Sequence, residues 1–190
     1  ISFQILKNKK FIFASSQMSN MNYSSYGVLK KVGEIVCSSL SCISVRFWNV
    51  YGVERDLKKS HVITDFILAG SKFKKISMLT NGQEKRDFLH VDDACSGLEV
   101  VMKNFEELKK FKTIDLNYGR YTKIIEVAKI IQKCFKDKNK IVKILRSKKK
   151  DLIQFNKKNK SSKNNFFKNH WKPKISLEVG IKNIFNYYIK

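Results

Sequence analysis

Residues 11–50 read FIFASSQMSNMNYSSYGVLKKVGEIVCSSLSCISVRFWNV and contain the elements that decide the fold. The apolar run 11–15 ends in small polar residues, which is typical of a buried parallel strand that delivers hydroxyl groups at its carboxyl end. Apolar residues recur at helical spacing over residues 26–40, and the β-branched and aromatic stretch 43–50 predicts the next strand. A strand, a helix and a second strand in this order predict an α/β fold with a parallel sheet.

The rest of the chain continues the alternation of helices and strands. Further helices are predicted over residues 61–70, from Asp92 or Asp93 to about residue 105, from Thr122 to about residue 135, and over residues 177–188. Further strands are predicted at residues 76–79, 88–91, 113–116 and 141–145. Gly70 is expected to end the first of these helices, because glycine is the common helix C-cap. Residues 156–165 read NKKNKSSKNN, a low-complexity stretch that predicts a flexible loop.

The chain of 190 residues is strongly basic, with 39 Lys and Arg against 16 Asp and Glu and a formal net charge of +23. Such a charge favours nucleic acid or an anionic membrane as a partner. However, 34 of the 39 basic residues are Lys, and Asn, Ile and Phe are abundant, as in an AT-rich coding sequence. We therefore expect compositional bias rather than nucleic-acid binding, with a polyanion partner as the alternative. Hydrophobic residues make up 43% of the chain, which excludes a disordered protein.

The four cysteines, Cys37, Cys42, Cys95 and Cys134, form no C-x-x-C pair and have no histidine cluster nearby. This spacing predicts no metal site and reduced structural thiols. No apolar run approaches the ~20 residues that span a bilayer, and no signal peptide is recognisable. The sequence therefore predicts a cytoplasmic protein without a membrane partner.

The sharpest chemical pattern joins Ser16 to Tyr26 and Lys30. Tyr26 and Lys30 are four residues apart, so a helix carries them on one face. A neighbouring ammonium favours the phenolate form of a tyrosine, which can then accept a proton from an alcohol. Ser16, at the end of the preceding strand, can hydrogen-bond the same substrate oxygen. By itself a Y-x-x-x-K pattern is weak, and a solvated helix face is the alternative interpretation.

The blocks FIFASS, YGVLK, RFWNVYG, RDFLHVDD and WKPKISLEVG follow one another along the chain. Together they resemble the extended short-chain dehydrogenase/reductase family, in its nucleotide-sugar epimerase/dehydratase branch, from about Phe11 to Tyr188. The resemblance implies the C-terminal part of a Rossmann-type doubly wound parallel sheet plus a small α/β substrate-binding lobe. It assigns residues 1–60 to a remnant of the NAD-binding Rossmann domain with the catalytic Ser and Tyr/Lys helix. It assigns residues 61–190 mainly to the substrate-binding lobe, with some segments returning to the Rossmann sheet.

The resemblance also implies a role for each matching residue. Ser16 matches the catalytic Ser/Thr of the family and Tyr26 its acid/base, while Lys30 matches the lysine that also holds the nicotinamide ribose of NAD. Tyr26 and Lys30 are thus the expected cofactor-binding residues in this chain.

Three further residues match the family's substrate-binding positions. Asn49, in RFWNVYG, matches a substrate-contacting asparagine, and Arg86, in RDF, matches an arginine that binds the nucleotide diphosphate. Arg146 resembles a second such arginine, with a longer spacer before Asp151 than the family pattern has. A guanidinium is a rigid fork suited to bidentate phosphate contacts, which supports both arginines as phosphate ligands. An ordinary surface ion pair is the alternative for each of them.

The chain departs from the family pattern in three ways. The glycine-rich G-x-x-G-x-x-G turn that binds the pyrophosphate is absent, so we expect the C-terminal part of a longer enzyme. Tyr26 follows Ser16 by only ten positions, which is short for the family. Gln17 and Met18 follow Ser16 where the 4,6-dehydratases of this branch carry an acidic pair, and this argues against a dehydratase.

The function predicted on these grounds is NAD-dependent epimerisation of a nucleotide-activated sugar through a transient keto intermediate. The partner is then a nucleotide-sugar substrate, and the intact parent is expected to be a homodimer. A nucleotide-sugar reductase or dehydrogenase is one alternative. An inactive basic fragment that acts as a binding module is the other.

Overall fold

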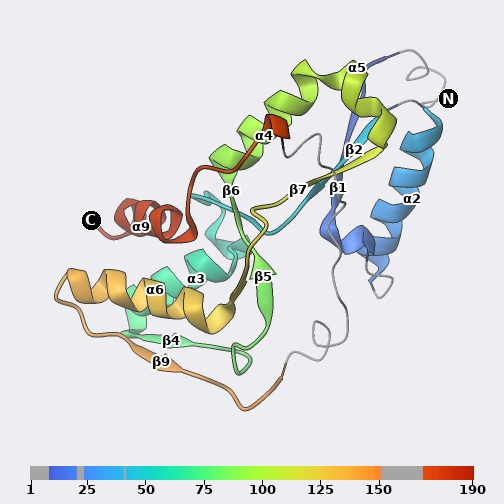
Figure 1. The fold of residues 1–190 in the computed structure, drawn as a ribbon. Helices are drawn as coiled ribbons and strands as arrows, with labels where there is room; N and C mark the ends of the chain where they lie inside the picture. The colour runs from blue at the N-terminus through green and yellow to red at the C-terminus, as the bar shows by residue number, and fades with distance from the viewer. Residues whose placement is uncertain (1–8, 21–23, 41, 151–168) are drawn as a thin grey trace. The chain divides into compact units, whose positions relative to one another are not determined.

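The structure, a computed structural model, describes residues 9–20, 24–40, 42–150 and 169–190 (Figure 1). The loop predicted over residues 156–165 and Asp151 lie outside these ranges. The chain divides into two compact units, each built from three segments. Unit 1 comprises Ile1–Val50, Asp92–Tyr118 and Lys158–Lys174, and unit 2 comprises Tyr51–Val91, Gly119–Lys157 and Ile175–Lys190. Residues 51–60 thus belong to unit 2, and the segment Asp92–Tyr118 returns to unit 1.

Unit 1 is built around a parallel sheet, as the strand–helix–strand pattern predicts. Its elements are β1 (Ile12–Ser16), η1 (Gln17–Asn20), α2 (Ser25–Ser39), β2 (Ile43–Phe47), α4 (Val91–Lys103), α5 (Phe105–Leu108), η3 (Lys109–Phe111) and β7 (Thr113–Leu116). The strands lie in the order β1-β2-β7, and both pairings are parallel. The α/β fold with a parallel Rossmann-like sheet is therefore confirmed.

The two faces of this sheet differ in character. Ser15, Arg46 and Asp115 stand in one register row across the three strands. In a strand successive side chains point to opposite faces, so the neighbouring row Ala14, Val45 and Ile114 faces the other way. Helix α2 packs against β1 and β2 and covers the polar row.

Unit 2 surrounds an apolar core. Its elements are β3 (Val50–Tyr51), η2 (Leu57–Lys59), α3 (Val62–Phe73), β4 (Lys75–Ser77), β5 (Lys85–Asp87), β6 (Leu89–His90), β8 (Tyr121–Lys123), α6 (Ile124–Asp137), β9 (Lys143–Leu145) and α9 (Leu177–Tyr188). Its strands pair two by two, as β3 with β6, β4 with β9 and β5 with β8. Helices α3, α6 and α9 pack together, with the ring of Phe135 edge-on to Phe185 at a centroid distance of 4.8 Å. No helix in the described part of the chain has the length and apolar character needed to cross a membrane.

The predicted end of the helix that starts near residue 61 was wrong. Helix α3 continues past Gly70 to Phe73, and Lys74 adopts the left-handed conformation that ends it, with φ 51°. Gly70 serves packing instead, because a Cβ at this position would stand 2.4 Å from Cε2 of Phe135. The glycine lets α6 approach α3 closely.

Two predicted helix starts were also wrong. Helix α4 begins at Val91, so Asp92 and Asp93 occupy its first turn, and Asp93 Oδ1 accepts a hydrogen bond of 2.9 Å from the backbone N–H of Lys174. Helix α6 begins at Ile124, after Lys123, whereas Thr122 pairs with Arg86 in the sheet. By contrast, α9 has the predicted bounds.

Candidate active site

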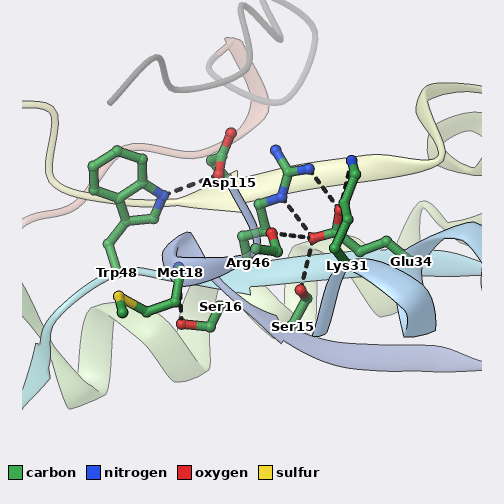
Figure 2. A network of polar contacts seen from close by, with 9 residues as sticks. Ser15, Ser16, Met18, Lys31, Glu34, Arg46, Trp48 and Asp115 are labelled. Carbon is green, nitrogen blue, oxygen red and sulfur yellow. Dashed lines mark hydrogen bonds and ion pairs between the residues drawn. The ribbon is translucent and has the colours of Figure 1, made fainter. Parts of the chain in front are cut away.

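Ser16 lies at the carboxyl end of β1, where the sequence predicts it. Its Oγ accepts a hydrogen bond of 3.2 Å from the backbone N–H of Met18, which closes the turn into η1 (Figure 2). The next residue, Gln17, donates from Nε2 to Oδ1 of Asn49 at 3.3 Å. Neighbouring parallel strands end at the same edge of the sheet, so the segments after β1 and β2 meet here. The structure thus brings Asn49 to the residue that follows Ser16.

Helix α2 brings Tyr26 and Lys30 together. The helix begins after Ser24, whose Oγ accepts a hydrogen bond of 3.0 Å from the backbone N–H of Gly27, as expected for an N-cap. Nζ of Lys30 lies 5.6 Å from the centroid of the Tyr26 ring. Tyr26 is 54% exposed, so its phenol is open to a ligand.

Lys30 also ties the helix to the sheet. Its Nζ donates a hydrogen bond of 2.7 Å to the backbone oxygen of Ala14 on β1 and lies 5.1 Å from the centroid of the Phe13 ring. Phe13 in turn occupies the space above Gly33, where a Cβ would stand 2.4 Å from Cζ of the ring. The ammonium therefore sits between the tyrosine and the strand that ends at Ser16.

A buried ion pair begins one turn beyond Lys30 on the same helix, at Glu34. The carboxylate of Glu34 accepts hydrogen bonds from Nε of Arg46 at 2.7 Å and from Nη2 at 2.6 Å. It also accepts a hydrogen bond from Oγ of Ser15 at 2.7 Å (Figure 2). A further hydrogen bond comes from Oγ of Ser19 at 2.6 Å. The side chain of Glu34 is only 3% exposed. One carboxylate thus joins α2 to β1, η1 and β2.

The network sets the charge of both partners. Burial alone would raise the pKa of Glu34, but the hydrogen bonds from Arg46, Ser15 and Ser19 outweigh burial and lower the pKa to about 2. Burial would lower the pKa of Arg46, and its hydrogen bonds with Glu34 raise it instead. Both groups are therefore ionised at neutral pH.

Asp115 extends the polar row on the third strand. Its carboxylate accepts a hydrogen bond of 2.9 Å from Nε1 of Trp48, a fully buried side chain. The negative charge of Asp115 also helps to raise the pKa of Arg46. Indole N–H groups need such a partner when they are buried.

Sequence reasoning missed Glu34 and Arg46. A signal existed, because Tyr26, Lys30 and Glu34 follow one another at intervals of four residues and so share one side of α2. Arg46 is an arginine inside a mostly apolar strand of a chain with few arginines, and a buried charge in that setting requires a partner.

The two arginines predicted to bind phosphate lie in unit 2. Arg86 is half-buried on β5, which pairs with β8. Arg146 is exposed and follows β9. On either side of it the chain is held by backbone hydrogen bonds, from Met78 N–H to Leu145 O at 2.8 Å and from Ser147 N–H to Thr80 O at 3.2 Å.

The described residues contain no group of three or more His, Cys, Asp or Glu side chains that could hold a metal ion.

The parallel α/β sheet of unit 1 is of the Rossmann type, and the helix with Tyr26 and Lys30 packs against its strands. Within this class, the model of the NAD dependent epimerase/dehydratase family matches residues 7–119. Because this match covers more than half of the chain, the chain belongs to that family of enzymes. No curated protein matches the sequence.

Solved structures with the same fold include enzymes of several kinds. UDP-glucose 4-epimerase from Thermotoga maritima, solved with UDP-glucose, has a TM-score of 0.72 and 20% identity over 95% of this chain and 63% of its own. dTDP-glucose 4,6-dehydratase from Bacillus anthracis, solved with NAD, has a TM-score of 0.75 and 18% identity over 98% of this chain and 64% of its own. A GDP-6-OMe-4-keto-L-xylo-heptose reductase from C. jejuni has a TM-score of 0.75 and 20% identity over 95% of this chain and 70% of its own. The chain thus spans less than two thirds of the epimerase and the dehydratase.

Proposed function

We propose that this chain carries the catalytic residues and substrate lobe of an NAD-dependent nucleotide-sugar epimerase. The observation that carries the proposal is the approach of Lys30 Nζ to within 5.6 Å of the Tyr26 ring, on a helix fixed beside the strand that ends at Ser16. Membership of the epimerase/dehydratase family supports it. So do the UDP-glucose and the NAD bound to two of the similar structures.

The residues have complementary tasks in this reaction. NAD, which Tyr26 and Lys30 would hold at its nicotinamide end, would supply reversible hydride transfer at the carbon of the reacting sugar hydroxyl. The phenol oxygen of Tyr26 takes the proton of that hydroxyl and gives it back when the hydride returns. Lys30 stabilises the phenolate, and Ser16 hydrogen-bonds the reacting oxygen and so orients it.

The residues of this chain fit one end of the dinucleotide. The ammonium of Lys30 and the exposed phenol of Tyr26 suit the nicotinamide ribose, which offers hydroxyl groups.

The sequence has no glycine-rich turn for the pyrophosphate. Within the described residues β1 pairs with β2 alone, and an apolar cavity of about 410 Å³ opens between β1, β2, α4 and α5, with Ile12, Phe47 and Met102 in its wall. We propose that a glycine-rich βα segment outside this chain pairs with β1 and covers the cavity.

Arg86 and Arg146 are proposed to bind the diphosphate of the nucleotide sugar, and Asn49 the substrate. A guanidinium offers two parallel N–H donors to a phosphate, which an ammonium does not.

A dehydratase is disfavoured because Gln17 and Met18 offer no acid after Ser16, and the Gln17 amide hydrogen-bonds Asn49. A reductase would use the same Tyr26 and Lys30, so only product analysis separates it from the epimerase.

A second copy of the chain is proposed to pack on α2. The helix has an inverted pattern, because small and polar residues such as Gly27 and Glu34 face inward. Its outer side carries four exposed apolar residues, Val28, Leu29, Val32 and Ile35. Sedimentation of Leu29→Glu tests this proposal, with Ile141→Glu at another exposed apolar position as the control. The dimer is expected to dissociate in the first variant only; an unchanged dimer in Leu29→Glu would contradict the proposal.

The function is tested by product analysis of the full-length gene product. UDP-, dTDP- and GDP-hexoses are incubated with enzyme and NAD, and the products are followed by proton NMR. We expect inversion at one sugar carbon without net formation of NADH. Net oxidation or reduction of the sugar would indicate the dehydrogenase or reductase instead. Binding of RNA that falls steeply with salt, without any turnover, would favour the basic binding module.

A further inference from the structure

The layer between α2 and the sheet is polar where an apolar layer is the rule. The row Ser15, Arg46 and Asp115 crosses three neighbouring strands, and all three side chains are buried. Glu34 enters this row from the helix above it. Charged residues are almost never fully buried unless they are paired, so the helix–sheet contact depends on this ion pair.

The ion pair holds both halves of the proposed proton-transfer site. On the helix side, Glu34 shares one side of α2 with Lys30 and Tyr26. On the strand side, it is bonded to Ser15 and Ser19, which flank the segment that contains Ser16. A displacement of Glu34 therefore moves Tyr26 and the Ser16 segment relative to each other.

Stability alone does not explain a buried ion pair. Taking two charges out of water is expensive, and replacement of such a pair by apolar residues of similar volume is often neutral or stabilising. The pair also fixes the orientation of α2 on the sheet, because a bidentate guanidinium–carboxylate contact fixes angles as well as distances. An apolar contact would let the helix slide or turn on the sheet.

We propose that Glu34 and Arg46 are positioning residues that set the register of α2 against the end of β1, and thereby the geometry between Tyr26, Lys30 and Ser16. This inference rests on the proposed function for its catalytic consequence. Neither residue touches the substrate. Each acts through the elements that it joins.

The decisive experiment compares two ways of removing the ion pair in the full-length enzyme. Glu34→Gln keeps the shape of the side chain and removes the carboxylate charge that is hydrogen-bonded to Arg46, so that only the charge of Asp115 still acts on the guanidinium. The double variant Glu34→Leu/Arg46→Met removes both charges of the pair and places apolar side chains at these two positions, while Ser15, Ser19 and Asp115 remain in the layer. Arg46→Lys retains the charge and loses the fork, and it serves as a second variant if the double variant does not fold. Glu99→Gln, at an exposed glutamate on α4, is the matched control.

A positioning role predicts that kcat and stability separate. Glu34→Gln and Arg46→Lys should each lower kcat by about 100-fold with KM changed less than about twofold, as expected for a displacement of roughly 1 Å at the reacting groups. The double variant should regain the melting temperature and keep the low kcat. A double variant that regains kcat along with stability would show that the pair is merely structural and overturn the proposal. Glu99→Gln should behave as the wild type.

A crystallographic comparison tests the same proposal without activity. If the wild type turns over no nucleotide sugar, the proposed function fails, and the positioning claim is then decided by crystal structures of this chain and its variants. We expect Arg46→Lys and the double variant to lose the contact of 2.7 Å between Lys30 Nζ and Ala14 O, with Tyr26 displaced relative to Ser16. Unchanged positions of both residues would overturn the proposal.

Discussion

Units 1 and 2 fill their interiors in different ways. The core of unit 2 is apolar, with fully buried Ile67 and Ile131 on neighbouring helices and Phe135 against Phe185. The α2 side of unit 1 instead buries Glu34 and a row of polar strand residues. Apolar contacts are strong in sum and have little direction, whereas hydrogen bonds depend on distance and angle. The comparison indicates that unit 2 is packed for stability and the α2 layer of unit 1 for geometry.

The largest effect on stability is expected in unit 2, from Phe135→Ala. The ring is fully buried between Gly70 and Phe185, so its removal leaves a cavity and should lower the free energy of unfolding by about 3–5 kcal/mol. Urea denaturation measures this loss. Phe73→Ala, at a phenylalanine that is 57% exposed, is the control and should change stability by less than about 0.5 kcal/mol. A loss below about 1 kcal/mol for Phe135→Ala would argue against the tight packing described for this core.

In unit 1 the stability should depend on pH through Glu34. The pKa of Glu34 in the folded protein, about 2, is below its ordinary value of 4.5. The ionised group therefore stabilises the fold fully above about pH 4.5, and this contribution is lost as the pH falls towards 2. The contribution of ionised Glu34 to the free energy of unfolding amounts to about 3 kcal/mol. Urea denaturation of wild type and Glu34→Gln at pH 6, 4 and 3 measures the difference.

We expect the stability of the wild type to fall more steeply with acid than that of Glu34→Gln. The exposed Glu99→Gln should follow the wild type. Parallel curves for the wild type and Glu34→Gln would mean that Glu34 is not held ionised by Arg46, and the contrast between the two interiors would lose its basis.

A smaller effect is expected at the proposed substrate contacts of unit 2. Arg86→Lys should weaken binding of a nucleoside diphosphate by about tenfold, or about 1.4 kcal/mol, because the ammonium lacks the fork of donors. Isothermal titration calorimetry with UDP, dTDP and GDP measures this. Arg120→Lys, at an exposed arginine, is the control. Equal affinity of wild type and Arg86→Lys for each nucleotide would remove Arg86 from the site.

The smallest signal is expected for binding of NAD to this chain alone. Lys30 and Tyr26 suit only the nicotinamide end, and most dinucleotide contacts of a Rossmann fold come from its glycine-rich βαβ unit. Ligand-detected NMR should therefore give a dissociation constant above about 10 μM, that is, weaker than about −7 kcal/mol. Tighter binding would mean that the chain builds its cofactor site in another way.

Much of this fold could be predicted from local patterns. Helices α2 and α9 and strand β7 have strong periodicity or clear caps, and their predicted positions agree with the structure to within about a residue. The prediction that Gly70 ends its helix was wrong because the role of this glycine is set by Phe135, which lies 65 residues later in the chain. Asp93 misled for the same reason, since it bonds the backbone of Lys174. Such distant partners leave no trace in local sequence.

The candidate site was predictable to a lesser degree. Ser16, Tyr26 and Lys30 are recognisable because their spacing reflects one strand end and one helix face, although their catalytic roles stay predictions. The partners that hold them were missed, because the pairing of Glu34 with Arg46 requires α2 to fold over β2. A residue that acts by positioning others carries no motif of its own.

The central claim is that Tyr26 transfers the proton in a nucleotide-sugar epimerase, and Tyr26→Phe tests it most directly. The measurement is kcat of the full-length enzyme, with binding of the nucleotide sugar followed by calorimetry and Tyr187→Phe, at an exposed tyrosine on α9, as the matched control. We predict that Tyr26→Phe lowers kcat by at least about 100-fold while binding stays within about twofold, because only the phenol oxygen is removed. Tyr187→Phe should retain full activity. A Tyr26→Phe enzyme that keeps more than about a tenth of kcat, a loss under about 1.4 kcal/mol, would contradict the account.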